Sequence, residues 1–188
     1  MRIVAGKFRA RALASPKTQA VRPTSDRLRE AVFNVLSHAY DDPLRDARVL
    51  DLFAGTGALA IEALSRGAAF ALFVDDSAEA RGLIRANVDA LGLGGTSRLF
   101  RRDATRLGPI SGMPPFSMVF CDPPYGKGLA EQALASARAG GWLTSDALVV
   151  VEEASDANFT WPDGFTAYEQ RSYGDTTVYF GGPQGSQA

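Results

Sequence analysis

The sequence contains few of the residues that bind metals or form disulfides. Its 188 residues include one cysteine, Cys121, and one histidine, His38. A single cysteine cannot form an internal disulfide, so we expect a cytoplasmic protein in a reducing compartment. With so few nitrogen and sulfur ligands, we predict neither a zinc site nor any other metal.

Long apolar runs are also absent. No stretch approaches the ~20 apolar residues that a membrane-spanning helix needs, and the first residues lack the pattern of a signal peptide. We therefore expect no membrane partner. The hydrophobic content of 46% and the charged content of 22% are typical of a globular protein with its own core.

Positive charge is scarce outside the beginning of the chain. Residues 1–29 contain eight lysines and arginines and one acid, a charge of +7, so the remainder carries −8 within a net charge of −1. A basic arm on an acidic body favours a polyanionic partner, although a solvated terminus without a partner is the alternative. The candidate phosphate-binding residues are Arg2, Lys7, Arg9, Arg11, Arg22 and Arg27.

Strand and helix patterns alternate over most of the chain. A helical apolar period follows the start signal TSD at residues 24–26, and helices are also expected at about 58–66, 78–91 and 129–139. Apolar strand patterns occupy residues 48–55, 70–76, 97–103, 117–122, 147–153, 165–173 and 177–180. This alternation predicts an α/β fold with a doubly wound, mostly parallel, seven-stranded sheet of the Rossmann-like kind.

The ends of the chain read differently from its middle. Residues 2–13, RIVAGKFRARAL, predict a small β-hairpin, and a proline-marked linker follows. We therefore expect a basic hairpin or arm at 1–22 and one domain at 23–181. The composition of residues 182–188 predicts a disordered tail.

A glycine-rich turn follows the first strand, in the stretch DLFAGTGALA. Gly55 and Gly57 permit a sharp turn and let a ligand approach the backbone at the start of a helix. With Ala60, and with Asp75 twenty residues after Gly55, the pattern also fits a dinucleotide fingerprint. Asp51 would repel a pyrophosphate but attract the ammonium group of a methionine moiety. By itself, the turn is compatible with a nicotinamide cofactor or with no ligand.

Two prolines end the strand pattern of the stretch SMVFCDPPYG. Because proline cannot donate to a sheet ladder, Pro123 and Pro124 hold the backbone beyond Asp122 stiff and extended. In the usual doubly wound order this strand lies beside the first, so Asp122 and Tyr125 would face the same crevice as the glycine turn. The alternative is an ordinary Pro-Pro turn.

DLFAGTGAL and DPPY together resemble the class I S-adenosylmethionine-dependent methyltransferases that act on an exocyclic amino group of a base. More narrowly, RIVAGKFRARAL, RPTSDRLREAVFNVL, DLFAGTGALAIEALSRGA and VFCDPPYGKG, in this order, resemble the RsmD-type guanine-N2 methyltransferases of bacterial small-subunit ribosomal RNA. The resemblance covers residues 2–180. It implies S-adenosylmethionine as cofactor and 16S ribosomal RNA as partner, either free or within a small-subunit assembly intermediate. We expect a monomer.

The resemblance also implies roles for individual residues. The cofactor-binding residues would be Asp51, Phe53, Gly55 and Gly57 at the methionine end, Asp75 at the ribose, and Asp103 and Ala104 at the adenine. The catalytic residues at the target base would be Asp122, Pro123, Pro124 and Tyr125, and the basic arm would bind RNA. Family members often have an acid where this chain has Ser77, so the ribose residue stays open between Asp75 and Asp76.

The chemistry of this site would require positioning rather than a covalent intermediate. An exocyclic amine is a poor nucleophile, whereas the methyl group of a sulfonium is reactive, so the protein supplies geometry and electrostatics. The Asp122 carboxylate and the Pro123 carbonyl would accept the two amine hydrogens, and Tyr125 would stack on the extruded base. The final proton acceptor is either Asp122 or solvent.

The identity of the base is less strongly determined. A carboxylate can accept from the adjacent ring N–H and amino group of guanine, whereas adenine presents a donor beside an acceptor. An adenine-N6 methyltransferase acting on RNA or DNA is therefore the main alternative. A nicotinamide oxidoreductase and a non-catalytic RNA-binding module remain as alternatives from other classes.

Overall fold

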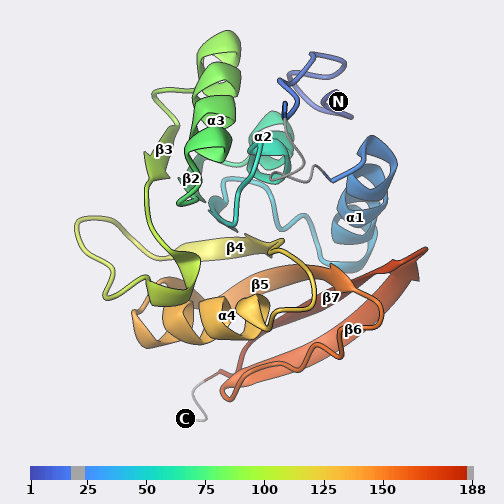
Figure 1. Cartoon of the computed structure of the whole chain (residues 1–188), viewed down its shortest axis with the longest axis vertical. Coiled ribbons are helices and arrows are strands. Elements are labelled where there is room, and N and C mark those ends of the chain that lie inside the picture. Colours follow the sequence, from blue (N-terminus) through green and yellow to red (C-terminus); the bar gives the residue numbers. More distant parts are fainter. Residues whose placement is uncertain (18–23, 186–188) are drawn as a thin grey trace.

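A seven-stranded sheet in the order β3-β2-β1-β4-β5-β7-β6 forms the centre of the computed structural model, which describes residues 1–17 and 24–185 (Figure 1). The strands are β1 (Arg48–Leu52), β2 (Phe70–Val74), β3 (Ser97–Phe100), β4 (Phe116–Cys121), β5 (Leu143–Ala154), β6 (Phe165–Tyr173) and β7 (Thr176–Pro183). Strands β1 to β5 pair in parallel, and β7 is antiparallel to both β5 and β6. The predicted doubly wound α/β fold is confirmed.

Helices cover both faces of this sheet. They are α1 (Asp26–Ala39), α2 (Ala58–Ser65), α3 (Ala78–Leu91) and α4 (Leu129–Ala139), with a short 3-10 helix η1 (Ala104–Arg106). Figure 1 shows α1, α2 and α3 on one face and α4 on the other. Ser25 and Ser77 cap α1 and α3, because their hydroxyls accept hydrogen bonds from Leu28 N and Ala80 N.

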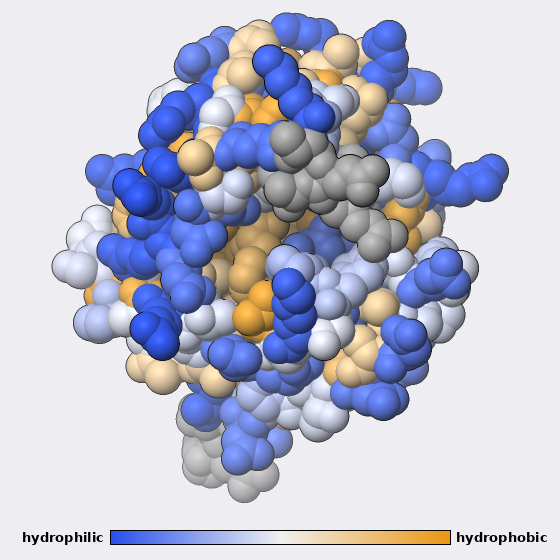
Figure 2. Space-filling model, viewed as in Figure 1, coloured by the Kyte–Doolittle hydropathy of each residue, from blue (hydrophilic) through white to orange (hydrophobic). Residues whose placement is uncertain are grey.

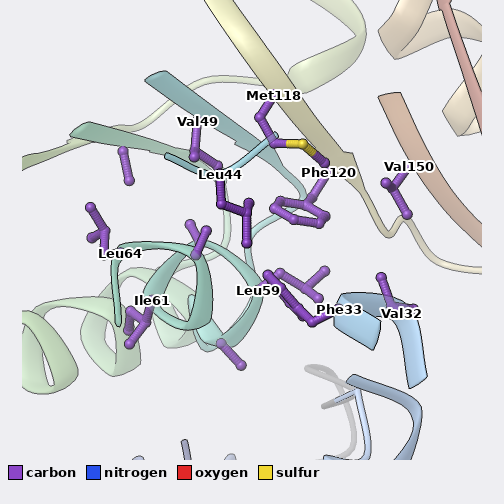
Figure 3. Close-up of a cluster of buried hydrophobic side chains, with 14 of the residues drawn as sticks. Val32, Phe33, Leu44, Val49, Leu59, Ile61, Leu64, Met118, Phe120 and Val150 are labelled. Atoms are coloured by element: carbon purple, nitrogen blue, oxygen red, sulfur yellow. The ribbon is translucent and has the colours of Figure 1, made fainter. Parts of the chain in front are cut away.

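The larger hydrophobic core lies between the sheet and helices α1 to α3. Phe33 of α1 packs on Phe120 of β4 with ring centroids 5.5 Å apart, and Figure 3 shows Leu59 of α2 near them. All residues of α2 are buried. Truncating a buried aromatic ring such as Phe33 to alanine would cost about 3–5 kcal/mol. This packing fixes the start of α1 near the carboxyl ends of the parallel strands.

The predicted N-terminal hairpin is reduced to a short antiparallel pairing. Within residues 1–17, hereafter the N-terminal segment, a single antiparallel bridge joins Arg2 and Ala12. The backbone is also bound to α2: Val4 N and Ala5 N donate to the Glu62 carboxylate at 2.8 and 3.1 Å. The approach is close, since a Cβ at position 6 would collide with the α2 backbone. Docking on α2 therefore supplements a strand pairing that is much shorter than the alternating pattern indicates, in which Ile3 N donates to the Arg11 carbonyl and Leu13 N to the Met1 carbonyl.

The last strand is longer than its apolar pattern. Strand β7 runs from Thr176 to Pro183, so it takes in Gly182 and Pro183, which composition places in a disordered tail. Gln184 N also donates to the Gly164 carbonyl at 2.8 Å. Gly182 and Pro183 are paired with Thr166 and Phe165 of β6, so this neighbouring strand holds the backbone in place. The expected boundary between arm and domain, at 22/23, lies outside the described residues.

The surface carries mainly hydrophilic residues. Figure 2 shows them covering most of one face, with hydrophobic residues reaching the surface near its middle. Among the described residues, Tyr168 is the one large hydrophobic side chain that is exposed. The described helices include none with the length and apolar character to cross a membrane.

Candidate active site

A cavity of about 990 Å³ lies where the parallel strands end. Its walls come from the start of α1, the turns after β1 to β4, the end of β5 and the β6–β7 hairpin. The position has a topological reason, because the strand order reverses direction between β1 and β4 and leaves a crevice there. Among the described residues that line it, Arg27 is the one base and the acids are Asp75, Asp76, Asp103, Asp122 and Glu152.

The glycine turn forms one wall of this cavity. Gly55 and Gly57 adopt left-handed conformations with φ of 62° and 81°, and the non-glycine residue Phe53 does so with φ of 57°. A Cβ at position 57 would lie 3.0 Å from the Phe73 ring, so the turn also packs tightly on β2. Phe53 and Gly55 line the cavity, whereas Gly57 lies behind the lining as the N-cap of α2.

Asp51 also lies behind the cavity wall rather than in it. The side chain is 1% exposed, its Oδ2 accepts from Ala60 N at 3.2 Å, and its buried Oδ1 has no partner. Burial raises the pKa of Asp51 well above its usual range, and the nearby Asp122 and Asp75 raise it further. One acceptor oxygen is thus left unused beside the glycine turn.

Asp75 and Asp76 both line the cavity but differ in their bonding. Asp75 Oδ2 accepts from Gly55 N at 3.0 Å and its Oδ1 accepts from Ser77 N at 2.9 Å. Burial raises the pKa of Asp75 although these two bonds lower it. Asp76 is exposed beside it. Asp75 therefore ties the turn after β1 to the turn after β2, and the ribose role stays a prediction for either residue.

The turn after β3 brings Asp103 to the same cavity. Its Oδ1 accepts from Thr105 N at 2.9 Å and from Thr105 Oγ1 at 2.7 Å, and these bonds lower the pKa of Asp103. Ala104 is buried and does not line the cavity, whereas Thr105 does. Thr105 was missed by sequence reasoning, although its place beside the predicted residues is a signal for it.

The D-P-P-Y stretch forms the opposite wall, with Asp122, Pro123, Pro124 and Tyr125 all lining the cavity. Asp122 Oδ2 accepts from Thr24 Oγ1 at 2.9 Å. The Tyr125 hydroxyl lies 3.3 Å from Thr176 Oγ1, and Gly126 N donates to Glu153 Oε1 at 2.9 Å. Strands β5 and β7 therefore fix the turn that the two prolines begin.

Sequence reasoning missed Glu152 and Thr24 at this wall. Glu152 is 2% exposed at the end of β5 and its Oε2 lies 3.4 Å from Thr24 Oγ1. The available signal was a pair of acids directly after an apolar run, ALVVVEE. This pattern predicted the strand, but it did not indicate that the end of the strand lines the cavity. The third missed part is the β6–β7 hairpin, where Tyr173 and Thr176 line the cavity.

The predicted RNA-binding residues are spread over several environments. Arg27 lines the cavity and is exposed, and Lys7 and Arg9 are exposed on the N-terminal segment. Arg2 and Arg11 donate to the carbonyls of residues 10 and 90. Arg22 lies outside the described residues.

The chain is similar in sequence and in structure to known proteins. The model of a family described as conserved hypothetical protein 95 matches residues 1–182. The chain is 37% identical over 176 residues to ribosomal RNA small subunit methyltransferase D of Escherichia coli (strain K12), covering 93% of this chain and 85% of that protein. The protein of the same name from Haemophilus influenzae is 31% identical over 93% of this chain and 89% of its own length. Among solved structures, yhhF from Escherichia coli superposes with a TM-score of 0.82 and 31% identity over 98% of both chains.

Proposed function

Because the chain belongs to the RsmD family, we propose that it transfers a methyl group from S-adenosylmethionine to the N2 amino group of a guanine in 16S ribosomal RNA. The fold and the family make it a methyltransferase, and ribosomal RNA as the substrate comes from the names of its relatives. One observation carries the proposal: D-P-P-Y and the glycine turn, distant in sequence, line one cavity.

The charge of the cavity lining suits S-adenosylmethionine. The bound cofactor supplies a methyl group on a positively charged sulfonium. Five acids against one base among the described lining residues favour such a cation. Phe53 and Gly55 would lie against the methionine end, and the unpartnered Asp51 Oδ1 is an acceptor available for its ammonium group. Asp75 or Asp76 would hold the ribose, and Asp103 with Thr105 would border the adenine.

The D-P-P-Y residues would position the reacting amine. The Asp122 carboxylate and the Pro123 carbonyl accept its two hydrogens, so the nitrogen lone pair is directed away from them and toward the methyl group. Positive charge develops on nitrogen as the bond forms, and both acceptors stabilise it. Tyr125 stacks on the extruded base, with its hydroxyl held near Thr176. The choice of guanine rests mainly on the resemblance to the RsmD family, and a carboxylate that can accept from two adjacent donors is consistent with it.

The basic residues would hold the RNA backbone. Arg27 at the cavity and the exposed Lys7 and Arg9 are placed to contact phosphates on either side of the target base, whereas Arg2 and Arg11 would contact phosphate beyond their backbone bonds. In this proposal residues 1–22 serve as an RNA-contacting arm on the catalytic domain, and the enzyme acts as a monomer in the cytoplasm.

A direct assay tests the proposal. The purified protein is incubated with isotopically labelled S-adenosylmethionine and either free 16S ribosomal RNA or small-subunit assembly particles, and nucleosides are identified by mass spectrometry. We expect N2-methylguanosine at one position, and no product with Asp122→Ala over the same time. N6-methyladenosine would replace the proposal by the adenine alternative. Failure of labelled cofactor to bind would remove the methyltransferase proposal altogether.

A further inference from the structure

Three carboxyl groups gather where β1, β4 and β5 end: those of Asp51, Asp122 and Glu152. Asp122 and Glu152 directly follow Cys121 and Val151, which are paired in the parallel register of β4 and β5. Asp51 and Glu152 are 1% and 2% exposed. The described residues include no group arranged to hold a metal ion. Like charges this close disfavour the ionised form of a buried carboxyl group.

Thr24 connects two of the three groups. Its Oγ1 lies 2.9 Å from Asp122 Oδ2 and 3.4 Å from Glu152 Oε2. A hydroxyl has one hydrogen, so it cannot donate to both carboxylates at once. If that hydrogen goes to the nearer oxygen, on Asp122, then the contact with Glu152 is favourable only when Glu152 Oε2 carries a proton of its own.

The described surroundings of Glu152 are also short of positive charge. Within residues 1–17 and 24–185, the ion pairs do not include it. Arg29 is close by, but its guanidinium binds the Thr24 carbonyl, Asp26 and Glu62. The exposed Arg27 lies at the cavity wall. Burial first, and then the charge of Asp122, raise the pKa of Glu152 well above its usual range. A hydrogen bond with Thr24 opposes the rise, and a hydrogen bond with Asp122 and the charge of Asp51 add to it.

We propose that Glu152 keeps its proton at neutral pH and acts as a positioning residue, which holds the ionised Asp122 in place for the reacting amine. This inference rests on the proposed methyl transfer. Asp122 and Glu152 together then carry a single negative charge, which is located on Asp122, the first residue of the D-P-P-Y stretch. Loss of the Glu152 proton would place two carboxylates side by side, and Asp122 would turn from the orientation that the amine requires.

The inference has a consequence for stability that does not involve RNA or cofactor. The folded-state pKa of Glu152 lies above its unfolded value, so between the two values the folded protein binds more protons than the unfolded chain. The stabilisation is therefore fully present below the unfolded pKa and is lost as pH rises through the folded pKa. Glu152→Gln has nearly the same shape and cannot ionise, so it should not lose stability in this window.

The stability experiment compares three proteins by calorimetry from acid to mildly alkaline pH: the parent, Glu152→Gln and Glu153→Gln. The matched control is Glu153, the next residue in the chain. Its carboxylate accepts from Gly126 N, whereas that of Glu152 contacts Asp122. We expect the melting temperature of Glu152→Gln to rise relative to the parent as pH increases, and that of Glu153→Gln to follow the parental slope. Equal slopes for the parent and Glu152→Gln would overturn the inference.

The kinetic experiment uses single-turnover methyl transfer to 16S ribosomal RNA across the same pH range. Glu152→Gln keeps an N–H donor toward Asp122, so we expect the parental rate near neutral pH without the parental decline at alkaline pH. Glu152→Ala lacks a donor and should be slower by roughly 10- to 100-fold, as for loss of a hydrogen bond to a charged group. Cofactor affinity should be unchanged in both variants. A parental rate and profile for Glu152→Ala would contradict the inference. If the parent methylates no RNA, the proposed function fails, while the melting curves still decide whether Glu152 holds a proton.

Discussion

Glu62 and Glu152 are both buried glutamates, yet their surroundings are opposite. Glu62 has no exposed surface and lies near two arginines, with Arg66 Nε at 2.9 Å and Arg29 Nε at 3.4 Å. Two backbone N–H groups of the N-terminal segment complete its shell. Glu152 instead faces other carboxyl groups, and its Oε1 has no partner.

The difference separates a structural site from a functional one. A buried charge with cations and N–H donors around it holds elements together, here the N-terminal segment, α1 and α2. A buried acid without a cation, at the wall of a cavity, is instead typical of groups that a site uses for ligand or proton binding. Both residues are buried glutamates, so it is their partners and not their chemical type that distinguish the two sites.

The strongest test of the comparison removes the structural acid. Glu62→Ala removes one of the two carboxylates that bind the buried Arg29 and the acceptor of Val4 N and Ala5 N. We expect a loss of about 3–5 kcal/mol in the free energy of unfolding, measured by urea denaturation. Glu152→Ala is the matched control and should destabilise the protein less, because no buried cation is left behind. A loss below about 1 kcal/mol for Glu62→Ala, the range of surface pairs, would mean that this network is not structural.

The next largest effect concerns the carboxylate that Glu152 contacts. Asp122→Ala should lower the single-turnover rate of methyl transfer by about 100-fold or more, because it removes a charge that acts in the transition state. Affinity for S-adenosylmethionine, measured by calorimetry, should stay within a few-fold of the parent. A parental transfer rate would mean that D-P-P-Y is only a turn and that the base is held elsewhere.

Tyr125 offers a smaller effect of a different kind. Its ring would stack on the base in both the ground and the transition state, so Tyr125→Ala should weaken the productive RNA complex by roughly 1–3 kcal/mol. Tyr125→Phe keeps the ring and loses only the contact with Thr176, so it serves as the control. Equal RNA affinity for the alanine and phenylalanine variants, both close to the parent, would exclude stacking.

Asp75 and Asp76 extend the comparison to the cofactor. Asp75 resembles Glu62 in that backbone N–H groups bind its oxygens, and Asp76 is exposed at the cavity. We expect Asp75→Ala to weaken S-adenosylmethionine binding by about 1–3 kcal/mol, through the ribose and through the Gly55 turn. If affinity falls with Asp76→Ala and not with Asp75→Ala in a folded protein, the ribose role belongs to Asp76.

The smallest expected effect is on the salt dependence of RNA binding. Replacing Lys7 and Arg9 by glutamine should flatten the slope of log affinity against log salt by about one unit per lost phosphate contact. Cofactor affinity should not change, because neither residue lines the cavity. An unaltered slope would make the exposed charge of the N-terminal segment a solvated surface without a partner.

Local patterns predicted the sheet, the helices and the meeting of two motifs. The glycine turn and the D-P-P-Y stretch carry their own geometry, through left-handed glycines and prolines that end a strand, so their places at strand ends could be read directly. Parallel order then puts β1 beside β4. None of this requires knowledge of distant partners.

The parts that sequence reasoning missed depend on such partners. The N-terminal segment has an alternating pattern, but its N–H groups bind Glu62, which is 58 positions from Val4. Glu152 acquires its surroundings only because β5 lies beside β4 and because Thr24 reaches across from α1. Nothing within a few residues of Glu152 encodes that contact.

The long reach of these contacts also sets the order in which the molecule can be completed during synthesis. Phe8 N needs Ser65 and Ala14 N needs Asn87, so the first residues to leave the ribosome must wait for partners made later. These pairs are 57 and 73 residues apart, so at ~5–20 residues per second the second partner follows roughly 3–15 s after the first. Thr24 waits longer, because Asp122 and Glu152 follow 98 and 128 positions behind it. The basic N-terminal segment therefore lacks its partners at the start of translation, and the cavity wall formed by Thr24, Asp122 and Glu152 is completed later.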